Sequence, residues 1–122
     1  MSTEPDLFQR FEDYLRYELD ASPRTVSSYS RDLERYRRYA EERLAEPFTP
    51  SEGDLDLVRG WLSSSLDAGV KASSVGKYLS SVKSFYRYLL KLGIIRRSPI
   101  QQLRPPKADK PLPVYVPTEE LN

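Results

Sequence analysis

The chain has 122 residues, 39% of them hydrophobic, which is enough for one folded domain with a buried core. It contains neither Cys nor His, which excludes disulfide bonds, thiolate metal sites and histidine acid–base chemistry. No apolar run reaches membrane-spanning length and the first residues lack a signal-peptide pattern, so we expect a soluble cytoplasmic protein without membrane contact. We also expect no cofactor.

The formal net charge of +1 conceals an uneven distribution of charge along the chain. Residues 1–60 hold nine Lys and Arg against 14 Asp and Glu, whereas residues 61–122 hold ten against four. Between residues 71 and 110, ten basic side chains accompany a single acidic one, Asp109. A basic half of this kind predicts a surface that binds an anionic partner.

The first predicted helix covers residues 5–20, and acidic residues in its early turns suit the positive end of the helix dipole. Apolar residues at helical spacing predict its buried face, which consists of Phe8, Phe11, Leu15 and Leu19.

The second predicted helix begins at Ser22-Pro23, an N-cap followed by proline at the first helical position, and ends near residue 43. Its predicted buried stripe is Val26, Tyr29, Leu33, Tyr36 and Ala40. Beside the stripe, the second half mixes both charge signs like an ordinary solvated face. The first half instead carries arginines and short hydroxyl side chains, namely Arg24, Thr25, Ser28 and Arg31.

The third helix is predicted from a capping-box pattern, Thr49-Pro50-Ser51-Glu52, and runs to about residue 67. Trp61 within it is interpreted as a core aromatic. The predicted apolar face consists of Leu55, Val58, Leu62 and Leu66.

The most regular helical pattern covers residues 72–92, and Gly93 behind it is typical of a helix end. Its predicted core face is Val75, Leu79, Val82, Tyr86 and Leu89, widened by Phe85, Leu90 and Leu92. The opposite face has no acidic residue and consists of Lys77, Ser80, Ser81, Ser84, Arg87 and Lys91. An ordinary solvated face mixes both signs, so cations beside short hydroxyls favour a helix that approaches a phosphate-rich surface.

Behind this helix, Ser98-Pro99 predicts one more short turn that ends near residue 103. Prolines recur through residues 104–117, which predicts an extended linker, and residues 118–121 resemble a capped helix start. We therefore expect a helical domain over residues 1–103, and over residues 104–122 a linker with the start of a further domain. On this interpretation the chain is the front part of a larger protein.

Catalytic chemistry is not recognisable in the sequence. It has no glycine-rich phosphate loop, and its carboxylates fall on solvated faces without converging as a pair. Of nine tyrosines, Tyr29, Tyr36 and Tyr86 fall on predicted buried faces, and the others have no identifiable activating base. We therefore expect neither a catalytic residue nor a metal site in this chain.

Several short stretches, in matching order, resemble the N-terminal core-binding domain of tyrosine recombinases, with Xer-type recombinases and phage integrases as the nearest members. They are Ser22-Pro23-Arg24-Thr25 with Tyr29 and Asp32-Leu33, Leu79-Ser80, Lys83 to Leu89, Ser98-Pro99-Ile100, and Lys107 to Leu121 with its Leu112-Pro113 and Thr118-Glu119-Glu120-Leu121. The chain departs from the family at Lys71-Ala72, where Ser-Pro is frequent, and at Tyr78, where a basic residue is common. The resemblance implies an all-α, four-helix SAM-like bundle whose second and fourth helices cross.

The resemblance also implies a function, which is DNA binding by one half of a recombinase clamp that grips a recombination half-site. The expected partners are double-stranded DNA and other recombinase protomers, and the fragment alone is expected to be monomeric and not an enzyme. A separate C-terminal domain of the parent recombinase would carry the residues that cut DNA. The residues matched to DNA contact are Arg24, Thr25, Ser28, Arg31, Lys77, Ser80, Ser81, Lys83, Ser84 and Arg87.

A second interpretation fits the same charge pattern. A helical protein-interaction domain could use the basic face to bind an acidic protein partner, and competition by short duplex DNA would distinguish the two functions.

Overall fold

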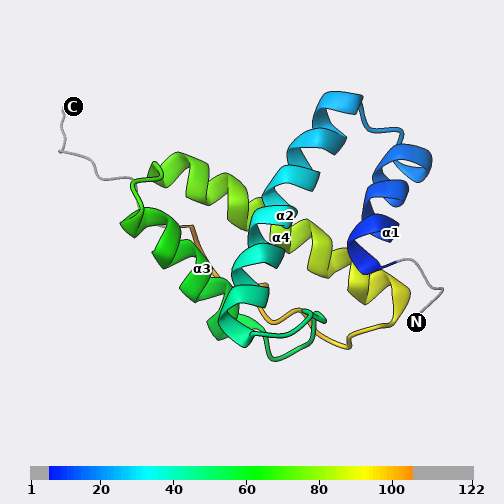
Figure 1. The fold of residues 1–122 in the computed structure, drawn as a ribbon. Coiled ribbons are helices and arrows are strands. Elements are labelled where there is room, and N and C mark those ends of the chain that lie inside the picture. Colours follow the sequence, from blue (N-terminus) through cyan, green and yellow to red (C-terminus); the bar gives the residue numbers. More distant parts are fainter. Residues whose placement is uncertain (1–5, 106–122) are drawn as a thin grey trace, which may run out of the picture.

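The computed structural model describes residues 6–105, which form helices and connecting turns without a β-strand in that range (Figure 1). The helices are α1 (Leu7–Asp13), continued by a π-helical stretch η1 (Tyr14–Glu18), α2 (Pro23–Leu44), α3 (Leu55–Asp67) and α4 (Ala72–Leu92). The predicted all-α, four-helix architecture is therefore confirmed. The predicted linker beyond residue 105 and the predicted helix start at residues 118–121 lie outside the described residues.

The other helices pack on α4, whose bounds are those predicted from the sequence. Gly93 ends it in the left-handed conformation, with φ of 77°, which a residue without Cβ adopts readily. Most of the predicted core face is confirmed, since solvent reaches at most 2% of Val75, Leu79, Val82, Phe85, Tyr86 and Leu89. Leu90 and Leu92 are half-buried, and Tyr88, which was not predicted, is buried as well.

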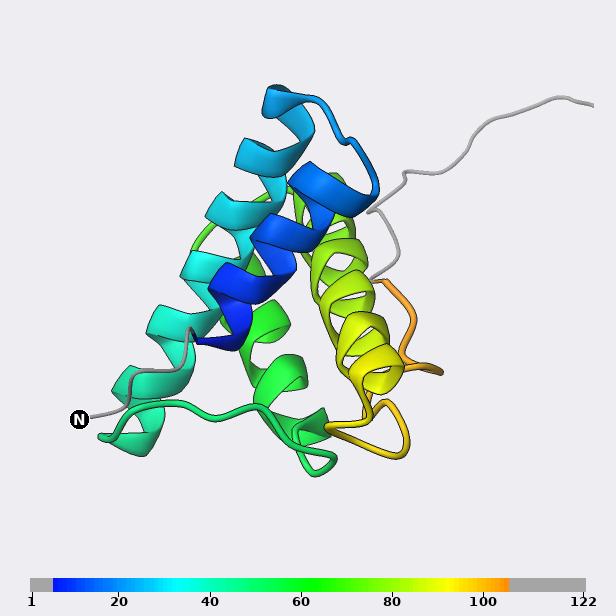
Figure 2. The ribbon, with the colours of Figure 1, turned by 90° about the vertical axis from the view of Figure 1, so that its right-hand side faces the viewer.

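α2 crosses α4 near the middle of both helices, so the pair defines four angles (Figure 1). α1 fills the angle between the N-terminal half of α2 and the C-terminal half of α4, as seen from the side in Figure 2. There the Phe11 ring lies 5.8 Å from that of Tyr29 and 5.5 Å from that of Tyr88. Aromatic contacts thus attach α1 to both crossed helices.

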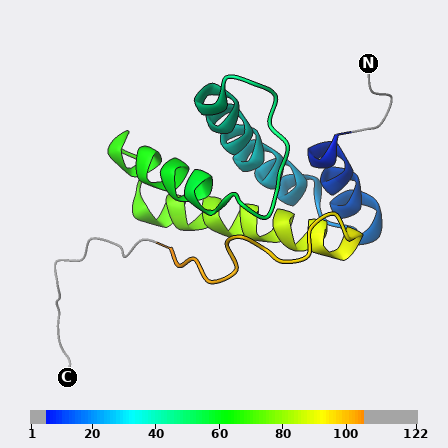
Figure 3. The same ribbon diagram turned by 90° about the horizontal axis from the view of Figure 1, so that it is seen from below.

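α3 fills the opposite angle, between the C-terminal half of α2 and the N-terminal half of α4 (Figure 3). Trp61 is 4% exposed there, stacked on Tyr78 at 5.1 Å and tilted against Tyr36 at 5.2 Å, which confirms it as a core aromatic. Connecting segments that contain the buried side chains of Phe48 and Ile95 lie in the third angle. No helix of residues 6–105 occupies the fourth angle, between the N-terminal halves of α2 and α4 (Figure 1).

The end of the first helix differs from the prediction. Residues 14–18 are π-helical, and the backbone N–H of Leu19 donates to the carbonyl of Tyr14, five residues back, at 3.1 Å. The wider turn rotates the following residue out of the α-helical register. Phe11 and Leu15 are buried as predicted. Leu19 follows the π-helical stretch, so it is 55% exposed and does not belong to the core face.

The predicted start of the third helix is also wrong. The helix begins at Leu55, and Thr49-Pro50 belongs to the preceding loop. Asp54 accepts hydrogen bonds from the backbone N–H of Ser51 at 2.8 Å and from its hydroxyl at 3.1 Å. These bonds close a turn immediately before the helix, and the Asp54 side chain does not cap the helix N–H groups as the predicted capping box would. Its end at Asp67 agrees with the prediction.

The turn predicted behind α4 is present. The backbone N–H of Ile100 donates to the Ser98 hydroxyl at 3.3 Å, and that of Leu103 donates to the Ile100 carbonyl at 3.0 Å. Because Ile100 is fully buried, this segment lies against the bundle.

Phe85 tests the importance of this core, because it is fully buried and its ring stacks on Phe8 at 4.5 Å. We expect Phe85→Ala to lower the free energy of unfolding by about 3–5 kcal/mol in a urea titration. Ile94→Ala is a matched control at a side chain that is 41% exposed, and it should cost less than about 1 kcal/mol. An unchanged thermal midpoint for Phe85→Ala would show that the core is assigned wrongly.

Candidate nucleic-acid interface

The uncovered angle of the crossing holds a groove of about 290 Å³, which we call the crossed-helix groove. No acidic residue of the described range 6–105 lines it. Its lining comes from the N-terminal halves of two helices, with Arg24, Thr25, Ser28 and Tyr29 from α2 and Lys77, Ser80 and Ser81 from α4. Except for Tyr29, all of these residues are on the list predicted from the sequence.

Local structure explains how α2 presents its side of the groove. Ser22 caps the helix, since its Oγ accepts a hydrogen bond from the backbone N–H of Thr25 at 3.1 Å, and Pro23 follows at the first helical position. Val26 points into the core with 1% exposure. The neighbouring positions Arg24 and Thr25 are therefore directed outward and are exposed.

Three of the other predicted residues line two neighbouring hollows. Lys83 and Arg87 line one of about 320 Å³ beside the turn at Ser98, and Ser84 and Arg87 line one of about 270 Å³ toward α1. Arg87 belongs to both. Arg31 is exposed on α2 but lines none of these three hollows.

The predicted exposure of Ser81 is wrong, since the sequence pattern placed this residue on the exposed face of the helix. Its side chain borders the groove but is only 3% exposed, and its hydroxyl donates to Oδ2 of Asp32 at 2.6 Å. Asp32 is 2% exposed and accepts a second hydrogen bond at the same oxygen from Nζ of Lys77 at 2.9 Å. The predicted acid-free face of α4 therefore has a buried carboxylate from α2 beneath it.

Sequence reasoning missed Asp32 as a residue of this site. A signal was available, because Asp32 lies three residues after Tyr29 and four before Tyr36, at the edge of the predicted buried stripe. Sequence reasoning also missed Arg59, Arg97 and Arg104, which line a further hollow of about 660 Å³. Nothing in the sequence places Arg59 beside the other two.

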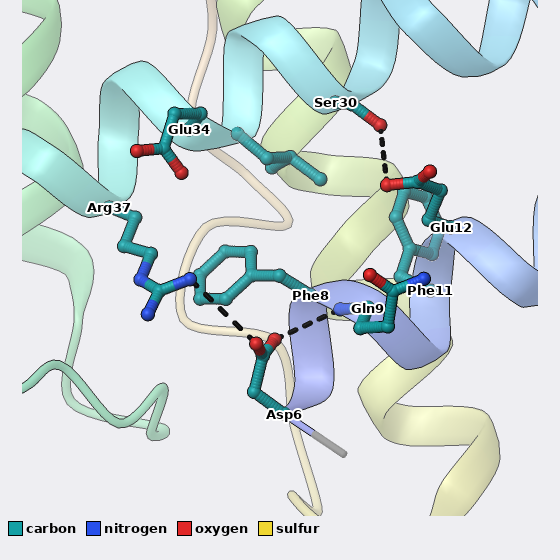
Figure 4. Close-up of a pocket in the computed structure, with 9 residues that line it drawn as sticks. Asp6, Phe8, Gln9, Phe11, Glu12, Ser30, Glu34 and Arg37 are labelled. Atoms are coloured by element: carbon teal, nitrogen blue, oxygen red, sulfur yellow. Dashed lines mark hydrogen bonds and ion pairs between the residues drawn. The ribbon is translucent and has the colours of Figure 1, made fainter.

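The hollow between α1 and α2 has the opposite character (Figure 4). Three carboxylates line it, those of Asp6, Glu12 and Glu34, together with Arg37. They serve structural contacts, since Asp6 caps α1 and lies 3.8 Å from the Arg37 guanidinium, and the Ser30 hydroxyl donates to Glu12 at 3.0 Å. This acidic hollow is unsuited to an anionic ligand.

Two tyrosines share a buried hydrogen-bond chain. The Tyr86 hydroxyl donates to Asp54 at 2.5 Å and lies 2.8 Å from the hydroxyl of Tyr36, which must then donate to it. Burial raises the pKa of both phenols far above that of an exposed tyrosine, and for Tyr86 the neighbouring Tyr36 and Asp54 raise it further. Both side chains are fully buried, so neither can act as a nucleophile toward an external substrate.

Residues 6–105 show neither a metal-binding cluster nor a membrane-spanning helix. That part of the chain contains no group of three or more Asp, Glu, His or Cys side chains arranged to hold a metal ion. None of its helices combines the length and the apolar character needed to cross a membrane.

Fold and surface together define an all-helical domain in which two crossed helices present a basic, hydroxyl-rich groove. Residues 8–93 match the family described as phage integrase, N-terminal SAM-like domain. The chain belongs to this family, which confirms the family and the SAM-like bundle expected from the sequence.

Proteins named tyrosine recombinase XerC are similar to most of the chain. The one from Pelobacter propionicus is 32% identical over 123 residues, covering 92% of this chain and 40% of that protein. The one from Chlorobaculum parvum is 35% identical over 114 residues, covering 90% and 34%, and the one from Myxococcus xanthus is 33% identical over 121 residues, covering 99% and 39%. The chain thus spans between 34% and 40% of the length of these relatives. No solved structure matches it significantly.

The buried tyrosines predict a loss of stability in alkali. Above about pH 10 the unfolded chain ionises Tyr36 and Tyr86 while the folded protein keeps them protonated. The folded state then binds more protons than the unfolded state, so stability falls as pH rises, by about 1.4 kcal/mol per pH unit for each residue. Urea titrations across this range should show a less steep fall for Tyr36→Phe. Titration of every tyrosine near pH 10 in the folded protein, followed by phenolate absorbance, would contradict the assignment.

Proposed function

We propose that this chain binds duplex DNA through the crossed-helix groove, as the N-terminal clamp domain of a site-specific tyrosine recombinase that grips a recombination half-site. The observation that carries the proposal is the lining of the groove. Two helices that are distant in the sequence bring Arg24 and Lys77 together with hydroxyl side chains, and none of the acidic residues within 6–105 lines the groove.

The chemistry of these side chains suits a nucleic-acid backbone. Arginine and serine or threonine hydroxyls donate hydrogen bonds to phosphate oxygens, and such contacts fix the position of a protein on the duplex. Short side chains such as Ser28 and Ser80 let the helix backbone come close to the DNA, so that longer ones reach base edges in the major groove.

The state of the arginines also supports the proposal. Among residues 6–105, neither Arg24 nor Arg87 takes part in an ion pair, and both are exposed. Arg38, on the far half of α2, instead pairs with Glu34 at 3.5 Å. The predicted DNA contacts at Lys83, Ser84, Arg31 and Arg87 extend the proposed surface beyond the groove. Ser81 would contribute through Asp32, because its hydroxyl is already bonded to that carboxylate.

On this proposal, other parts of a larger recombinase cleave the DNA strands. The relatives carry the name tyrosine recombinase, and the chain spans only 34–40% of their length. The complete absence of His and the burial of Tyr36 and Tyr86 agree with a binding function for this chain. Its partners would then be duplex DNA and the other protomers of a recombination complex.

The salt dependence of binding tests the proposed surface. Each phosphate contact releases condensed counterions, which adds about 0.9 to the slope of log K against log salt concentration. We expect Arg24→Ala/Arg87→Ala to bind a short duplex more weakly and to flatten this slope by about 1–2 units in fluorescence anisotropy titrations.

Arg38→Ala/Arg43→Ala is the matched control, since it removes the same formal charge from exposed positions on the far half of α2. Its slope should equal that of the wild type. Equal effects of the two double variants would mean that only net charge matters. Wild-type protein that fails to bind duplex DNA at low salt would contradict the function itself and favour an acidic protein partner.

A second expectation concerns activity and assembly. We expect the isolated chain to be a monomer by light scattering and to leave supercoiled plasmid intact. Tyr36 and Tyr86 are fully buried, and exposed tyrosines such as Tyr17 have no identifiable activating base. Nicking that survives repurification and disappears in a Tyr→Phe variant would overturn this view of its tyrosines.

A further inference from the structure

The carboxylate of Asp32 lies beneath the crossed-helix groove, in contact with two residues that line it. It is 2% exposed, and its Oδ2 accepts hydrogen bonds from the Ser81 hydroxyl at 2.6 Å and from Nζ of Lys77 at 2.9 Å. Its other oxygen lies 3.4 Å from the Arg35 guanidinium. Hydrogen bonds from these three side chains hold the buried carboxylate in place.

Lys77 links this buried group to the groove. Its side chain is 55% exposed and lines the groove, while its ammonium group pairs with Asp32. An ammonium group has three N–H donors, and one donor directed at Asp32 leaves two for other acceptors. The charge of Lys77, however, is largely cancelled by the carboxylate 2.9 Å away.

We propose that Asp32 is a positioning residue for DNA recognition that converts Lys77 from a free cation into an oriented hydrogen-bond donor. The inference rests on the proposed DNA-binding function and assigns different roles to the two basic residues of the groove. Arg24, without an ion pair among the described residues, supplies attraction for phosphates regardless of sequence. The Lys77–Asp32 pair adds little attraction of that kind and directs its remaining N–H groups toward acceptors on the DNA, such as the edge of guanine.

The neighbouring contacts show why Asp32 does more than hold two helices together. Asparagine at this position could still accept the hydrogen bond from Ser81, so the bond across the crossing does not by itself require a charge. The charge acts on Lys77 at 2.9 Å and on Arg35 at the longer distance of 3.4 Å. Without it, the Lys77 ammonium group would be a free cation at the proposed DNA surface. Removing that charge should therefore alter how binding depends on salt.

Asp32→Asn is the direct test, with a short duplex of random sequence as the probe. Freeing Lys77 to neutralise a phosphate should steepen the slope of log K against log salt concentration by about 0.9 and tighten binding at low salt. Variant and wild-type affinities should then diverge by about 3.5-fold for each fourfold change in salt concentration. A helix crossing that was merely weakened would lower affinity and would not steepen the slope.

Lys77→Ala gives an independent measurement if Asp32→Asn does not fold. Because the wild-type Lys77 is already paired, its removal should leave the slope unchanged, whereas loss of a free phosphate-binding cation would flatten it by about 0.9. In the double variant Asp32→Asn/Lys77→Ala, the steepening expected from Asp32→Asn should disappear.

Glu34→Gln is the matched control, because it removes one negative charge from an exposed position of the same helix. Its slope should equal that of the wild type. The proposal is wrong if Asp32→Asn leaves the slope unchanged or flattens it, or if Lys77→Ala flattens it, while wild-type protein still binds DNA. Failure of the wild type to bind any duplex at low salt would instead refute the proposed function, and this inference with it.

Discussion

The fold depends on the packing of α2 against α4, and two buried polar contacts fix how these helices meet. On α2, Asp32 accepts a hydrogen bond from Ser81, and Tyr36, one turn further along, bonds to Tyr86. A buried polar group without a partner costs about 1–3 kcal/mol, and a charged group costs more. Sliding α2 along α4 would separate both pairs at once. These contacts therefore specify the register of the crossing, which apolar packing alone would leave less well defined.

Once the crossing is fixed, aromatic side chains decide which of its angles are filled. Phe8 and Phe11 attach α1 to the C-terminal half of α4, and Trp61 attaches α3 to its N-terminal half. Within the described part of the chain, no such aromatic contact attaches a further helix in the angle between the two N-terminal halves, which keeps a groove instead. The surface proposed to bind DNA is thus the part of the crossing that the core does not cover.

The division of charge along the chain becomes a division between faces. Acidic residues of α1 and α2 gather in the hollow around Arg37, where they cap a helix and form ion pairs (Figure 4). The basic residues of α4 line the groove and the hollows next to it. Unlike charges on separate faces orient a protein in the field of a polyanion, because the acidic face is repelled while the basic face is attracted.

The sequence by itself determined the bounds of α4, the N-cap of α2 and most core positions on both helices, because these depend on local periodicity and capping. It also indicated the family and most of the residues that line the groove. It could not place the start of α3. The turn before this helix is closed by hydrogen bonds that the Asp54 carboxylate accepts, and this carboxylate also accepts one from Tyr86, which is distant in the sequence. Nor did periodicity reveal the π-helical turn that exposes Leu19.

Only the tertiary structure decided the state of the side chains at the crossing. The sequence predicts Ser81 and Lys77 to be exposed donors, because a helical pattern describes one helix at a time. Their acceptor, Asp32, lies on another helix more than 40 residues earlier in the chain. Which donors are free and which are already bonded depends on how α2 and α4 pack, because a hydrogen bond requires the two groups to approach within about 3 Å.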